Sequence, residues 1–137
     1  MEVFGSRWKN HWQRIAADWK SRVSDDDVVL IAGDTSWAMH LKEAQEDLDQ
    51  IRALPGKKII IRGNHDYWWE SAGKLNRMDA ENNMQYLYGS TAVLGDKDIA
   101  ICGTHGWVCP GDIHYQEDRD AKPYRRELLR VERTLQE

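Results

Sequence analysis

The chain has 137 residues, of which 41% are hydrophobic, 9% aromatic and 31% charged, and its formal net charge is −4. This balance is typical of a globular domain and excludes a disordered chain, while the acidic charge argues against the basic footprint of a nucleic-acid-binding protein. Cys102 and Cys109 are too few for a disulfide framework and are predicted to be reduced. The sequence has no apolar run of roughly 20 residues and no signal-peptide core. We therefore expect a soluble cytoplasmic protein with no membrane partner.

The first predicted element is an amphipathic helix over residues 8–23. Its large apolar side chains recur at intervals of 4, 3, 4 and 4 residues, which places on one helix face Trp8, Trp12, Ile15, Trp19 and Val23. Such a face can dock on a sheet, or it can form a stacking platform for nucleic-acid bases. The acidic charge of the chain favours docking on a sheet.

A strand–helix–strand pattern follows this helix. Segment 27–32 contains the continuous apolar run typical of a strand buried on both faces. Apolar residues at helical spacing then predict a helix over 41–54, which ends at the helix breakers Pro55 and Gly56. Segment 57–62 is a second buried strand. Two strands joined by a helix are expected to run parallel.

Each of these two strands is followed by a short polar loop. The first loop covers residues 33–36 and the second covers residues 63–66. Parallel strands end at the same edge of a sheet, and open sheets of this type bind ligands there. We therefore expect the two loops to lie side by side.

The rest of the chain predicts a helix, a set of short strands and a final helix. The turn residues 95–98 between the last two strands favour a hairpin, and residues 108–121 have the polarity of a loop. The expected elements are a helix over 68–77, strands over 85–88, 92–94 and 99–102, and a helix over 124–135.

The two polar loops carry the side chains that suit metal chemistry. Asp34 lies in the first loop, and Asn64, His65 and Asp66 lie in the second. A carboxylate can bridge two cations, an amide oxygen can bind one of them, and such a metal pair activates a shared water. A nearby imidazole can protonate a leaving oxygen. A Gly-Asp pair after a strand is often only a turn, but its combination with the rarer Gly-Asn-His-Asp indicates a site.

These motifs resemble the calcineurin-like metallophosphoesterase superfamily, and the likeness extends from Met1 to Glu137. That family orders its motifs as Asp-x-His, Gly-Asp, Gly-Asn-His-Asp/Glu, a lone His and Gly-His-x-His. Gly33-Asp34 is similar to the second motif and 63–66 to the third. Segments 33–39, 62–69 and 101–107 resemble a bacterial, poorly characterised branch, in which we expect Arg at the position of His105.

The resemblance implies a fold and a set of roles. The fold would be part of a four-layer α/β/β/α sandwich with mixed sheets. Asp34 would bridge two divalent ions (Mn, Fe, Zn or Mg), Asn64 would bind the second ion, and His65 would contact the scissile phosphate and assist the leaving group. Asp66 would support the loop, and His105 would be a supporting or substrate-side residue that binds no metal. The implied reaction is attack of a metal-activated hydroxide on a phosphomonoester or phosphodiester.

The chain also departs from the family pattern. No Asp-x-His precedes Val28, and no Gly-His-x-His follows Trp107. The only Asp-x-His, at 112–114, is out of order and is predicted to be a surface loop. Many family members place an Asp three residues after the bridging carboxylate to orient the catalytic imidazole, and here that position is Trp37.

These departures predict a single partial phosphoesterase domain over residues 1–137, truncated at both ends. We expect such a chain to bind a metal pair weakly or not at all, and to self-associate through exposed sheet edges. The alternative is a non-catalytic interaction or scaffold module that retains the fold without a complete metal site. A nucleotide-binding domain is disfavoured because no Gly-rich phosphate loop is present.

Overall fold

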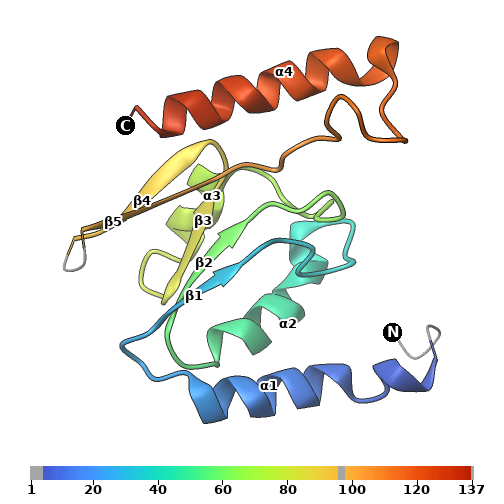
Figure 1. Ribbon diagram of the computed structural model, residues 1–137. Coiled ribbons are helices and arrows are strands. Elements are labelled where there is room, and N and C mark those ends of the chain that lie inside the picture. The colour runs from blue at the N-terminus through green and yellow to red at the C-terminus, as the bar shows by residue number, and fades with distance from the viewer. Residues whose placement is uncertain (1–4, 96–97, 137) are drawn as a thin grey trace.

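The computed structural model describes residues 5–95 and 98–136 (Figure 1). It is a mixed α/β structure, as predicted, with a short 3₁₀ helix at Ser6–Trp8. The helices are α1 (His11–Arg22), α2 (Leu41–Arg52), α3 (Ala72–Met78) and α4 (Glu117–Thr134), and the strands are β1 (Val28–Ile31), β2 (Lys57–Ile61), β3 (Met84–Leu87), β4 (Ser90–Leu94) and β5 (Ile99–Gly103).

The first three strands form a parallel sheet in the order β1-β2-β3. Leu30 of β1 pairs with Ile59 of β2, and Ile59 pairs with Gln85 of β3. The predicted parallel pairing of the first two strands is therefore confirmed. Because β1 and β2 run in the same direction and in register, the loops that follow them leave the sheet at the same edge.

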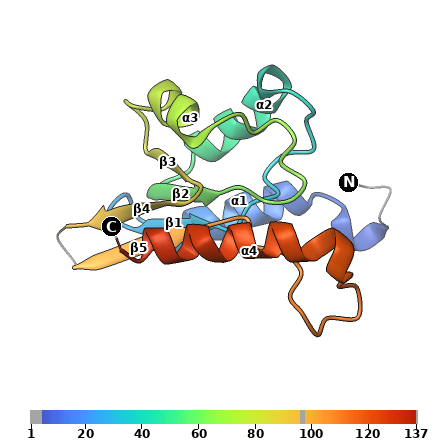
Figure 2. The same cartoon turned by 90° about the horizontal axis from the view of Figure 1, so that it is seen from above.

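Both faces of the parallel sheet are covered, each by a different layer (Figure 2). Helices α2 and α3 pack on one face, where Leu48 and Leu75 join Ile60 and Tyr86 in the larger core cluster. On the other face, the hairpin strands β4 and β5 form a second cluster in which Ala92 and Leu94 contact the strand residues Ile59 and Leu87. Burial of these apolar side chains is the main force that holds the layers together.

Strands β4 and β5 pair antiparallel, from Ser90 opposite Gly103 to Leu94 opposite Ile99. This confirms the predicted hairpin, although positions 96 and 97 of its predicted turn lie outside the described residues. Helix α4 packs along the hairpin, where the Thr91 hydroxyl donates a hydrogen bond to the Thr134 carbonyl oxygen at 2.9 Å. The layers follow the predicted order of helix, sheet, sheet and helix.

Strand β1 differs from its prediction as a strand buried on both faces. Val28 and Ile31 pack against the two core clusters, but Leu30 is 61% exposed. Leu30 is exposed because β1 lies at the edge of the sheet. The hairpin covers β2 and β3 and does not extend over Leu30. A continuous apolar run in the sequence cannot distinguish a central strand from an edge strand.

Three helix boundaries also differ from the predictions. The N-terminal helix is interrupted at Asn10, which has a left-handed φ of 53°. Helix α3 begins at Ala72, where Ser71 caps it, and the predicted first turn is instead a bend that buries Trp68 and Trp69. Helix α4 begins at Glu117, inside the predicted loop, because the buried Asp120 carboxylate accepts the Gln116 backbone N–H at 2.7 Å.

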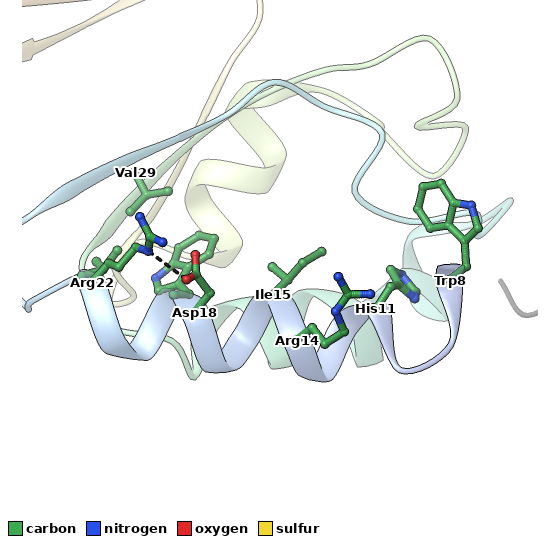
Figure 3. Close-up of a pocket in the computed structure, with 9 residues that line it drawn as sticks. Trp8, His11, Arg14, Ile15, Asp18, Arg22 and Val29 are labelled. Carbon is green, nitrogen blue, oxygen red and sulfur yellow. Dashed lines mark hydrogen bonds and ion pairs between the residues drawn. The ribbon is translucent and has the colours of Figure 1, made fainter. Parts of the chain in front are cut away.

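The apolar face of α1 is less buried than the docking prediction requires. Trp12 packs against the larger core cluster and the Trp19 indole donates a hydrogen bond to the Pro55 carbonyl at 3.0 Å. Trp8 and Ile15, in contrast, are 43% and 48% exposed. Trp8, in the 3₁₀ helix, and Ile15, in α1, line a cavity of about 850 Å³ that also contacts Val29 of β1 (Figure 3).

Two further sequence predictions concern the surface of the chain. Cys102 and Cys109, which the sequence predicts to be reduced, are free thiols, and both are exposed. Among residues 5–95 and 98–136, no helix has the length and apolarity that crossing a membrane would require.

Candidate functional site

The polar loops after β1 and β2 meet, as the sequence predicts. The backbone N–H of His65 donates to Oδ1 of Asp34 at 2.9 Å, and the imidazole Nδ1 of His65 lies 3.1 Å from Oδ2 of the same carboxylate. Both side chains are about half exposed, at 48% for Asp34 and 43% for His65. The carboxylate and the imidazole therefore form a contact at the surface, at the edge of the sheet where parallel strands end.

Two glycines allow the loops to approach this closely. A Cβ atom on Gly33 would collide with the backbone of Gly63, and a Cβ on Gly63 would collide with the carboxylate and backbone nitrogen of Asp34. Gly33 also has a φ of 92°, a conformation that residues with a side chain rarely adopt. The glycine in each motif is thus needed to bring Asp34 and His65 together.

Asp66 is the residue that ties the two loops to each other. Its side chain is fully buried and accepts hydrogen bonds from the backbone N–H groups of Asp34 at 2.8 Å, Thr35 at 2.9 Å and Gly63 at 2.7 Å. The Thr35 hydroxyl and the buried Trp68 indole donate to the same carboxylate. With both oxygens engaged and no exposure, Asp66 serves as an internal anchor for the loops.

Aromatic rings surround the imidazole of His65. The Trp37 ring stacks on it with a centroid distance of 5.5 Å and an interplanar angle of 20°, and the Tyr67 ring meets it edge-on at 6.3 Å. The Asn64 amide nitrogen lies 3.4 Å from Nε2 of the ring. Trp37 occupies the position at which the resemblance led us to expect an orienting carboxylate, and it restricts the ring by stacking.

The pKa of Asp34 is held below its ordinary value. The largest cause is the hydrogen bond from the His65 backbone N–H, and partial burial opposes it. The hydrogen bond and charge of the His65 imidazole and the charge of His105 lower the pKa further. His105 follows β5, and its ring contacts Trp107 with a centroid distance of 5.8 Å.

The donor atoms present fit part of a metal site. Asp34 and Asn64 offer exposed carboxylate and amide oxygens, which are suitable ligands for hard divalent ions. Within residues 5–95 and 98–136, however, no group of three His, Cys, Asp or Glu side chains converges as a metal site would require. The remaining Asp-x-His lies in an exposed turn before α4, where the His114 backbone N–H donates to Asp112.

The sequence analysis identified the polar residues of the candidate site, but it predicted no contact between His65 and the aromatic residues beside it. Trp37 and Tyr67 are each within a few residues of a motif, and their position in the sequence was the only available signal. Their contacts with His65 depend on how the loops fold, which periodicity does not encode.

Comparison with known proteins gives one match. A family model described as calcineurin-like phosphoesterase matches residues 6–137. No curated protein and no solved structure matches the chain. The matched segment includes both polar loops and every helix and strand of the fold.

Proposed function

Because this chain belongs to the calcineurin-like phosphoesterase family, we propose that Asp34, Asn64 and His65 take part in the metal-dependent hydrolysis of phosphate esters. The observation that supports the proposal best is the contact of the His65 ring and backbone with the Asp34 carboxylate, at 3.1 and 2.9 Å. This contact brings a carboxylate suited to cations and an imidazole suited to proton transfer to one point on the surface.

In this proposal, Asp34 and Asn64 hold divalent cations such as Mn, Fe, Zn or Mg. A bound divalent ion supplies Lewis acidity toward the phosphoryl oxygens and lowers the pKa of water. The depressed pKa of Asp34 keeps its carboxylate ionised and therefore able to attract a cation. The net charge of −4 is compatible with a phosphate-ester substrate, because a bound cation supplies positive charge locally.

His65 acts on the leaving group. Hydrolysis breaks the bond between phosphorus and the leaving oxygen, places the hydroxyl of water on phosphorus and delivers a proton to that oxygen. With Nδ1 directed at Asp34, the remaining ring nitrogen, Nε2, is the one that gives the proton. Trp37 restricts the ring by stacking, and His105 takes a supporting or substrate-side role.

The proposal is tested by hydrolysis of p-nitrophenyl phosphate and bis-p-nitrophenyl phosphate, a monoester and a diester, with manganese in large excess so that weak binding is overcome. Replacement of the imidazole in His65→Ala should lower kcat by about 10²–10⁴-fold, and Asp34→Asn should raise the manganese concentration needed for activity. Asp112→Asn, in the exposed turn, is the matched control and should leave both quantities unchanged. Equal rates in all four proteins would contradict the proposal and favour a non-catalytic module.

A further inference from the structure

The two aromatic residues beside His65 are exposed. Trp37 is 63% exposed and Tyr67 is 54% exposed, although each ring contacts the imidazole. Single exposed aromatics are common on protein surfaces and need no explanation. Here, two exposed aromatic rings contact the same imidazole, that of His65. One ring comes from the segment after β1 and the other from the segment after β2.

A cavity extends from the same place. It measures about 600 Å³, and its wall includes Asp34 and Trp37, which follow β1, and Trp12 and Trp19 of α1. Its volume is in the range of small-molecule sites, which are mostly lined by apolar and aromatic side chains with a few polar groups. Trp37 therefore belongs both to the surroundings of His65 and to an aromatic cavity that reaches Asp34.

We propose that Trp37 and Tyr67 form a binding site for a planar aromatic group of the phosphate ester, either an aryl group or a nucleobase. This inference rests on the proposed function, since it assigns the substrate class of the same site. If phosphorus is next to Nε2 of His65, the group attached to the leaving oxygen comes within reach of rings centred 5.5 and 6.3 Å from the imidazole. Aromatic faces stack on such groups without needing a particular pattern of hydrogen-bond donors.

A purely positioning role for Trp37 makes a different prediction. If stacking serves only to orient His65, removal of the indole should reduce the turnover of all phosphate esters by the same factor. If Trp37 and Tyr67 bind the substrate, their removal should abolish the preference for aromatic esters and leave aliphatic esters less affected. Trp37→Leu and Tyr67→Leu are suitable variants, because leucine retains apolar volume and removes the aromatic face.

Binding is measured first and without turnover, by titrating the metal-free chain with phenyl phosphate and with ethyl phosphate and following the ¹H–¹⁵N spectrum. Phenyl phosphate should bind about tenfold more tightly than ethyl phosphate and should shift the Trp37 indole N–H. A parallel titration with adenosine 5′-monophosphate and ribose 5-phosphate distinguishes a nucleobase from a simple aryl group. Trp37→Leu and Tyr67→Leu should each reduce the preference, whereas Tyr115→Leu, which removes a ring before α4 whose hydroxyl donates to Glu117, should retain it.

The outcomes separate this inference from the proposed function. Equal binding of the aromatic and aliphatic phosphates, or no binding of either, would overturn the aromatic site, as would an unchanged preference in the double variant Trp37→Leu/Tyr67→Leu. Preferential binding of phenyl phosphate without hydrolysis in excess manganese would uphold the aromatic site and contradict the proposed hydrolase. Urea unfolding of each variant shows whether it remains folded.

Discussion

The carboxylate of Asp66 accepts a hydrogen bond of 2.8 Å from the backbone nitrogen of Asp34, which is 32 residues away in the sequence. The same Asp66 oxygen accepts the Gly63 N–H at 2.7 Å, so one buried side chain holds both loops of the candidate site. The position of the exposed Asp34 therefore depends on a residue that is itself inaccessible to a ligand.

Asp66→Asn should destabilise the protein by about 2–4 kcal/mol. Asparagine replaces one accepting oxygen with an NH₂ group, which would face the N–H donors that Asp66 now satisfies, and buried unsatisfied donors are costly. Urea unfolding followed by circular dichroism measures the change. Asp26→Asn, at an exposed turn, is the control and should alter the free energy of unfolding by less than about 0.5 kcal/mol. Equal stability of the two variants would show that Asp66 is not an anchor.

Gly63→Ala should lower the free energy of unfolding by at least about 2 kcal/mol, because the added Cβ would collide with Asp34. Gly73→Ala adds the same methyl group to α3, where the nearest atom is Arg77 Nη1 at 3.6 Å, and should leave stability unchanged or raise it by up to about 1 kcal/mol. Denaturation midpoints and the NMR shifts of His65 test both variants. A Gly63→Ala protein with native stability and native His65 shifts would contradict the close approach of the loops.

The buried Asp79 should make the free energy of unfolding fall at low pH. Burial opposes ionisation of Asp79, but hydrogen bonds from Arg52 at 2.6 Å and from the Tyr86 hydroxyl at 2.7 Å outweigh it and hold the pKa of Asp79 below its ordinary value. Because the folded-state pKa is depressed, this stabilisation is fully present above the unfolded-state pKa of about 3.9 and is lost as pH falls through the folded-state pKa.

Asp79→Asn tests this pH dependence. The variant should be less stable by about 3–5 kcal/mol near neutral pH, since Arg52 loses its buried carboxylate partner and retains only the exposed carboxylate of Asp49. Its stability should also fall less steeply than that of the wild type below about pH 4. Urea unfolding over a pH series measures how the free energy of unfolding of each protein changes with pH. The same slope in the variant and the wild type would show that Asp79 does not cause the acid sensitivity.

The 137-residue chain should bind manganese more weakly than about 0.1 mM and with fewer than two ions per chain. Asp34 and Asn64 supply only part of a ligand set, and both oxygens of Asp34 are already in contact with His65. Isothermal titration calorimetry measures affinity and stoichiometry. Asp34→Asn should weaken the binding further, while Asp112→Asn should not. Two tightly held ions per chain would contradict this prediction.

Self-association through the edge of β1 is a further prediction. Among the described strands, β1 has a neighbour on one side only, and its Leu30 is 61% exposed, so both backbone pairing and apolar contact are available to a second copy. Light scattering should show a mass that rises with concentration, and Leu30→Lys should suppress the rise. Ile113→Lys changes a 92% exposed residue in a turn and should have no effect. A monomer at every concentration would refute the prediction.

The sequence by itself determined the order of the main elements and the place of the candidate site. The apolar runs at 28–31 and 59–61 and the helical spacing between them were sufficient to predict a parallel pair. That pair brings the loops carrying Asp34 and His65 to one edge. These features are encoded locally, because side-chain periodicity and glycine-rich turns act over a few residues.

Only the tertiary structure decided how the site is assembled. The stack of Trp37 on His65, the hydrogen bonds that Asp34 and Thr35 donate to Asp66 and the exposure of Leu30 all depend on segments that are distant in the sequence. The start of α4 at Glu117 was also missed, since it is stabilised by the buried Asp120. The physical reason is that burial and hydrogen-bond partners are properties of the packed layers, and a local pattern specifies what a segment can form without specifying what it will contact.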